Sequence, residues 1–249
     1  MERIAERFTG NTIMMNIQLQ DSSIQIANIH ELEKLIGGIG FFPLFRNSIP
    51  GFSLEEHTIY APWWSGDPHR DPWEWRMTIA SEHKIAYGKF FSGKAGFISS
   101  EWLPAFCNSR RNGYDFDALW DDELASFRQK RIMDCFSDKE ELFSFQLKRM
   151  AGFDKQGEKN FEGTISSLQQ KLYLVDSDFR RRRNRYGIEY GWHIAKYAMP
   201  EKIWGYEYIT SEYSSEPADS YDRIRSRITE VYPQISETGI RFLAGERPQ

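Results

Sequence analysis

Apolar residues recur at helical spacing between residues 121 and 172, with polar residues between them. This period predicts three helices in succession. The first is marked by Leu124, Phe127, Arg131 and Cys135, with Ile132 and Phe136 beside them. The second carries Leu142, Phe143, Leu147 and Met150, and the third carries Phe161, Ile165, Leu168 and Leu172.

Two strand-like stretches follow the third helix, at residues 172–182 and 189–199. The polar segment 184–187 separates them, so we expect a β-hairpin with its turn there. Three helices followed by a hairpin is the chain order of a winged helix, in which the hairpin forms the wing. We therefore predict a winged-helix module over residues 121–205.

The pattern before residue 121 is less regular. Residues 1–28 favour an extended N-terminal arm, and residues 29–120 an aromatic-rich region of helices and strands. Asn28 is expected to cap a helix that ends at Gly37 and Gly38. Asp71 and Pro72 have the form of a second helix start, and Ser92 and Gly93 suit a tight turn between strands 85–91 and 95–98.

The C-terminal region, residues 206–249, contains a charged helix around residues 219–231 and is expected to form a helical cap on the preceding module. The chain has 249 residues, of which 40% are hydrophobic and 15% aromatic, enough for the core of one large domain or two smaller ones. The fold class that we predict is α/β (α+β), with winged helix-turn-helix elements.

Charge is unevenly distributed along the chain. The formal net charge is −4, which argues against a protein that coats DNA indiscriminately. Residues 139–196 hold 12 Lys and Arg against 8 Asp and Glu, whereas residues 115–141 hold 4 against 9. Any contact with nucleic acid must therefore be local.

The predicted hairpin tip carries five arginines: Arg180, Arg181, Arg182, Arg183 and Arg185. Guanidinium groups stay charged and offer planar donors to phosphate oxygens or guanine edges, so DNA is the expected partner. Lys155 and Lys159, near the start of the third helix, would contact the DNA backbone. The alternative is a solvated hairpin, or one that binds an acidic protein surface.

Residues 61–75 form the densest aromatic segment. Trp63 and Trp64 could stack on an extruded base, and Asp67, Asp71 and His69 are the candidates for acid-base chemistry beside them. The alternative is that the two aspartates form turns and caps and that the tryptophans belong to the core.

The sequence gives no indication of a metal, cofactor or membrane site. Cys107 and Cys135 lack metal-type spacing and are expected to be buried free thiols. No apolar run reaches the length of a membrane span, and no signal peptide is apparent, so we expect a cytoplasmic protein.

Several segments resemble the AlkZ/YcaQ-type winged-helix family of bacterial DNA glycosylases, and more closely a short branch described as AlkZ-related. The segments are Leu32–Phe41, Gly96–Pro104, Lys159–Leu174 and Ala198–Glu201. The resemblance implies winged helices around a DNA channel. It also implies a glutamine followed, two residues later, by glutamine or aspartate, which positions the water that attacks the sugar.

At the corresponding place, this chain has Pro43 and Phe45, and neither side chain can orient or deprotonate water. Gln18 and Gln20 show the right spacing but precede the first helix. We therefore expect a DNA-binding protein without the base-excision chemistry of the family. The alternatives are a glycosylase whose catalytic carboxylate has moved to Asp67 or Asp71, and a winged-helix module that binds another protein.

Overall fold

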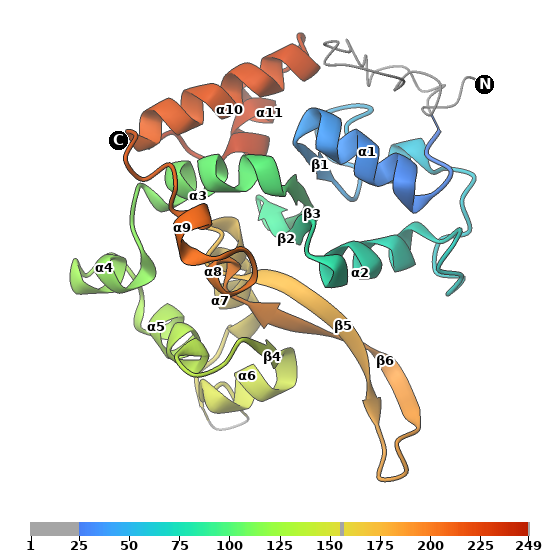
Figure 1. Cartoon of the computed structure of the whole chain (residues 1–249), viewed down its shortest axis with the longest axis vertical. Helices are drawn as coiled ribbons and strands as arrows, with labels where there is room; N and C mark the ends of the chain where they lie inside the picture. The colour runs from blue at the N-terminus through green and yellow to red at the C-terminus, as the bar shows by residue number, and fades with distance from the viewer. Residues whose placement is uncertain (1–24, 155–156, 249) are drawn as a thin grey trace.

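A single antiparallel sheet of six strands organises the fold, in the order β1-β3-β2-β5-β6-β4 (Figure 1). The computed structural model describes residues 25–154 and 157–248. The strands are β1 (Phe41–Pro43), β2 (Ile85–Phe91), β3 (Lys94–Ser99), β4 (Glu141–Phe143), β5 (Val175–Arg183) and β6 (Glu189–Ala198). Together with the helices around it, this sheet confirms the mixed α/β class.

Helices lie around the sheet and at its two ends. The α-helices are α1 (Ile29–Ile39), α2 (Pro72–Glu82), α3 (Leu103–Arg111), α4 (Phe116–Asp121), α5 (Phe127–Met133), α6 (Ser144–Met150), α7 (Phe161–Gln170), α8 (Pro200–Trp204), α9 (Tyr206–Ile209), α10 (Pro217–Val231) and α11 (Glu237–Ala244). Three short 3-10 helices are η2 (Glu55–His57), η3 (Ser100–Trp102) and η4 (Asp134–Phe136).

The two halves of the sheet repeat one arrangement. In each half a hairpin, β2–β3 or β5–β6, has a short strand, β1 or β4, paired with its second strand. The chain order is also alike, α1-β1-α2-β2-β3 in the first half and α5-β4-α6-α7-β5-β6 in the second. The halves join where β2 pairs with β5, with Tyr87 opposite Asp176.

Two hydrophobic cores correspond to these halves. The first contains side chains from α1, β1, α2, β2, β3 and α3, such as Leu35, Trp75 and Phe97. The second contains side chains from the part of the chain that runs from α4 to β6, such as Ile132, Leu147 and Ile165. Cys107 is buried in the first core, and both Cys107 and Cys135 are free thiols.

The C-terminal helices cover the first core. Ile224 and Ile228 of α10 and Leu243 of α11 are buried there, and α10 packs along α3 (Figure 1). The expectation that residues 206–249 cap the module immediately before them is therefore wrong. The apolar face of α10 is completed by α3, a partner about 100 residues earlier in the chain, which the local pattern could not reveal.

Several local predictions are confirmed. Asn28 caps α1 by accepting a hydrogen bond from the backbone N–H of Glu31, and Asp71 caps α2 in the same way from Trp73. The strands β2 and β3 follow the predicted hairpin closely. However, α1 continues through Gly37 and Gly38 to Ile39, and it is capped by Gly40, whose φ of 100° and proximity to Trp102 both require glycine.

The predicted second helix of the 121–172 region begins too early. Leu142 and Phe143 belong to β4, which pairs with β6, and α6 begins only at Ser144. The first predicted helix is also divided, because α5 starts at Phe127 and leaves Leu124 outside it. Leu124 and Phe127 are exposed, so the apolar period there did not mark a core face.

No helix in segments 25–154 and 157–248 combines the length and apolar character that a membrane span requires. Most of the expected N-terminal arm, including Gln18 and Gln20, lies outside the described residues.

Candidate nucleic-acid interface

The β5–β6 hairpin projects from the body of the molecule (Figure 1). From Arg181 to Trp192 its residues are exposed, and Arg182 lies opposite Tyr190 in the register. The turn is held by the Asn184 side chain, whose Oδ1 accepts the N–H groups of Tyr186 (2.9 Å) and Ile188 (3.1 Å). The hairpin therefore presents both edges of its outer half to solvent.

The five arginines of this hairpin differ in their partners. Arg180 donates to Asp178 (2.7 Å), which raises its pKa, and Arg183 pairs with Glu189 (3.1 Å). Arg181, Arg182 and Arg185 form no ion pair with any carboxylate among the described residues. These three guanidiniums have charge available for an anionic ligand.

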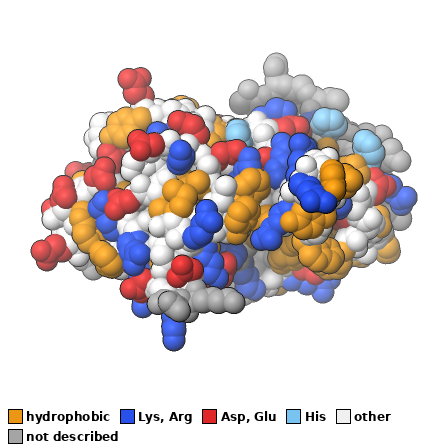
Figure 2. Space-filling view, turned by 90° about the horizontal axis from the view of Figure 1, so that it is seen from below, with side chains coloured by type: hydrophobic (Ala, Val, Ile, Leu, Met, Phe, Trp, Pro, Cys, Tyr) orange, Lys and Arg blue, Asp and Glu red, His pale blue; other side chains and the backbone are white. Residues whose placement is uncertain are grey.

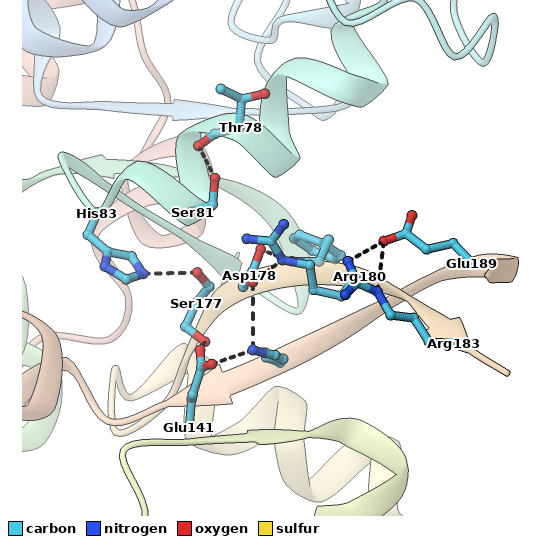
Figure 3. Close-up of polar contacts among 11 residues, drawn as sticks. Thr78, Ser81, His83, Glu141, Ser177, Asp178, Arg180, Arg183 and Glu189 are labelled. Carbon is cyan, nitrogen blue, oxygen red and sulfur yellow. Dashed lines mark hydrogen bonds and ion pairs between the residues drawn. The ribbon is translucent and has the colours of Figure 1, made fainter. Parts of the chain in front are cut away.

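The base of the hairpin is fixed by a polar network (Figure 3). Lys196 forms an ion pair with Glu141 of β4 and lies 3.7 Å from Asp178. Ser177 donates from Oγ to Glu141 (3.1 Å), and its carbonyl accepts a hydrogen bond from Nε2 of His83 (3.0 Å). Elements on both sides thus orient the base, whereas the arginine-bearing outer half has no such support.

The same hairpin also carries exposed aromatic side chains. Tyr186, Tyr190 and Trp192 are 71%, 49% and 91% exposed. Viewed from the hairpin end, hydrophobic and basic side chains are interleaved on the surface (Figure 2). This combination suits nucleic acid, because bases stack on aromatic rings while phosphates pair with cations. The sequence prediction missed Tyr190 and Trp192, although both occur within five residues after the turn.

A second aromatic group lies near the foot of the hairpin. Trp63, Trp64 and Trp73 are in ring contact, and Phe45 lies 5.8 Å from Trp63 and 6.1 Å from Trp73 between ring centroids. Trp64 is 67% exposed, whereas Trp63 is half-buried and donates from its indole to Thr58. Of the two predicted stacking residues, Trp64 therefore offers the more accessible ring.

Arg76 of α2 connects this aromatic group to the hairpin. Its guanidinium lies 3.6 Å from the ring centroid of Trp73 and 4.3 Å from that of Phe179 on β5. The side chain is buried, and its Nε has no hydrogen-bond partner within the described part of the chain. The sequence prediction did not identify this cation-π contact, because it depends on pairing between the two halves.

The predicted acid-base candidates occupy a turn before α2. Asp71 is fully buried and accepts from the N–H groups of Trp73 (2.8 Å) and Gly66 (2.9 Å), while Asp67 accepts from His69 N–H (2.9 Å). The imidazole of His69 is exposed. These contacts favour the turn and cap interpretation over acid-base chemistry.

The basic residues expected near the third helix contribute less. Lys159 is exposed just before α7, and Lys155 lies outside the described residues. Gln169 of α7 is buried, where it accepts from Lys89 N–H and donates to Asp176 (3.1 Å). Gln169 therefore cannot face a groove of DNA.

Asp176 is the most perturbed carboxyl near the hairpin. Burial raises its pKa to about 7, opposed by the hydrogen bond from Gln169 and by the charge of Arg76. It lies at the junction of β2 and β5, away from the hairpin tip. Within the described segments, no group of three His, Cys, Asp or Glu side chains could hold a metal ion.

The family model described as AlkZ related matches residues 26–245, which include every element above. The chain belongs to the AlkZ-related family. No curated protein and no solved structure matches it. Membership in the AlkZ-related family confirms the resemblance and connects the chain with the theme of DNA repair.

Pro43 and Phe45 stand at the position where the resemblance to the family implies a pair of side chains that orient water. Pro43 pairs with Gly96 at the end of β1, and Phe45 packs against Trp63 and Trp73. A pyrrolidine ring and a benzyl ring provide no oxygen or nitrogen that could hold water.

Proposed function

We propose that this protein binds double-stranded or damaged DNA through the β5–β6 hairpin, and that it does so as a pair of winged-helix modules. The order α5-β4-α6-α7-β5-β6, with β4 on the outer edge of the hairpin, supports the second module. The similar order in the first half supports another. On this proposal β5 and β6 are a wing, which reaches the DNA backbone or a groove.

The exposed hairpin is the observation that carries this proposal. Arg181, Arg182 and Arg185 lack carboxylate partners among the described residues, and the aromatic side chains of Tyr186 and Trp192 are exposed on the same hairpin. Guanidiniums that are arranged along a narrow ribbon are suited to the phosphates of a nucleic-acid backbone.

We further propose that this protein binds DNA without excising a base. Base excision requires a polar side chain that orients water toward the sugar. The aromatic contacts of Phe45 fill the position that would hold such a group. Asp71 is fully engaged as a helix cap, so it is a poor replacement.

The binding proposal predicts a strong salt dependence that the hairpin controls. Changing Arg181, Arg182 and Arg185 together to Ala should reduce the slope of log K against log salt by about 0.9 for each lost phosphate contact. The measurement is fluorescence anisotropy with a labelled duplex over a salt series. Unchanged affinity and slope in this variant would remove the support for the hairpin as the binding surface.

A matched control removes the same charge elsewhere. Arg225, Arg241 and Arg247 are arginines of the C-terminal region that are each paired with a carboxylate; Arg241 and Arg247 are exposed and Arg225 is partly exposed. Their triple Ala variant should bind duplex like the wild type. An equal loss of duplex affinity in both variants would show that DNA is attracted to positive charge in general. Heparin should then compete with the labelled duplex as well as unlabelled DNA does. That result is the one expected of a module that binds acidic proteins.

The excision proposal is tested by incubating the protein with alkylated duplex and measuring free base. We expect no release above the spontaneous rate. Release by the wild type that disappears in Asp67→Asn, with DNA binding retained, would instead establish a glycosylase with a relocated carboxylate.

A further inference from the structure

A groove lies on the α6 side of the hairpin, distinct from the aromatic group at α2. Its volume is about 640 Å³, within the range of about 300–1,000 Å³ that is typical of ligand sites. It is lined by Phe143, Phe145, Arg180, Arg181, Arg182, Arg183, Glu189 and Tyr190.

The floor of the groove is an aromatic platform made by Phe143 and Phe145. Their rings are stacked, with centroids 5.4 Å apart and planes 26° apart. Phe145 is 43% exposed, and neither ring belongs to the two hydrophobic cores. Phe143 is half-buried, so the exposed ring of Phe145 is the part of this platform that is available to a planar ligand.

The walls of the groove are strongly basic. Of the four arginines that line it, Arg180 pairs with Asp178 and Arg183 with Glu189, which leaves Arg181 and Arg182 without a carboxylate partner among the described residues. The guanidinium of Arg182 lies 5.0 Å from the ring centroid of Phe145, so a cation adjoins the platform directly. A ligand suited to both parts is flat and carries negative charge close to its ring.

The groove remains open because β4 covers only the base of β6. Phe143 is opposite Lys196, and β4 ends there. Within segments 25–154 and 157–248, no strand pairs with the outer part of β6, including Tyr190, on that edge. A strand of nucleic acid could therefore enter from the hairpin tip.

We propose that this groove binds an unpaired nucleotide of DNA, with the base on Phe145 and its phosphates on Arg181 and Arg182. The choice of DNA rests on the function proposed above. A paired base has both faces covered by its neighbours, whereas an unpaired base exposes a face that an aromatic ring can stack against. An acidic peptide would satisfy the arginines but would leave the platform unused.

The test compares binding of labelled oligo(dT) and of a duplex of equal length to the full chain and to Phe145→Ala and Phe145→Leu. Both variants should bind oligo(dT) about 5 to 150 times more weakly, the effect of losing one base–aromatic stacking contact, and should bind duplex as the wild type does. Thermal unfolding should be unchanged, because Phe145 lies outside both cores.

Phe127→Leu is the matched control, since Phe127 is a 62% exposed ring of α5 outside this groove. It should leave oligo(dT) binding unchanged. Wild-type affinity in Phe145→Leu would overturn the stacking proposal, and so would equal weakening in Phe127→Leu. Tighter binding of an equivalent ribo-oligonucleotide than of oligo(dT) would overturn the assignment to DNA.

The outcomes separate the two proposals. If duplex binds and oligo(dT) binding is absent or independent of Phe145, the groove proposal fails and the hairpin proposal stands. If duplex does not bind but oligo(dT) binds in a manner that depends on Phe145, the hairpin proposal fails and the groove proposal stands.

Discussion

The carboxyl of Asp176 should make the stability of this protein fall as pH rises through neutrality. Burial raises its pKa from 3.8 to about 7 in the folded chain, despite the hydrogen bond from Gln169 and the nearby charge of Arg76. The group lies where β2 meets β5, so its ionisation acts on the junction between the two halves of the sheet.

The sign follows from proton binding. Between pH 3.8 and about 7 the folded state holds a proton on Asp176 that the unfolded state has released. Stability therefore decreases with rising pH in this window and levels off above it. From these two pKa values, the loss between pH 5 and pH 8 is about 2.5 kcal/mol.

Asp176→Asn isolates this effect, because the amide is neutral at every pH and its oxygen can still accept from Gln169. The free energy of unfolding should be measured by urea denaturation from pH 5 to pH 8.5. The stability of the variant relative to wild type should rise by about 2.5 kcal/mol over that range. Asp138→Asn, at an exposed carboxylate, should show no comparable trend. A constant difference between Asp176→Asn and wild type would refute the reasoning.

Two further predictions concern residues that hold the fold together. Asp71→Ala should lower the free energy of unfolding by about 1–2 kcal/mol, because the α2 cap is lost, and should leave duplex affinity unchanged. Urea denaturation and anisotropy titrations measure the two quantities. Weaker DNA binding without lower stability would contradict the cap interpretation. Arg110→Met should destabilise by roughly 3 kcal/mol, because the guanidinium of Arg110 donates to the carbonyls of Phe90, Gln170, Leu243 and Ala244. A urea midpoint equal to that of wild type would show that water replaces those donors.

The elements that the sequence predicted well depend on local chemistry. The caps at Asn28 and Asp71 and the β5–β6 hairpin follow from side chains within a few residues of each other. In contrast, β4 is three residues long and exists because β6 provides its partner, so the apolar Leu142 and Phe143 could equally begin a helix in isolation.

The candidate site divides in the same way. A run of arginines at a turn is visible in the sequence, but whether each guanidinium is paired is not. Asp178 neutralises Arg180 because both side chains lie on one face of β5, and Glu189 reaches Arg183 across the hairpin. Arg76 and Phe145 could not be identified from local patterns, since their rings and cations come from elements that meet only in the folded chain.

The separation of charge has a consequence for how DNA would approach. Asp115, Asp117 and Asp134 line a second groove beside α4 and η4, in the acidic part of the chain. A phosphate backbone is repelled there and attracted to the hairpin, so the field of the whole molecule would orient the encounter even though its net charge is −4. If the hairpin binds DNA as proposed, the uneven distribution of charge would restrict productive encounters to the face that carries Arg181, Arg182 and Arg185.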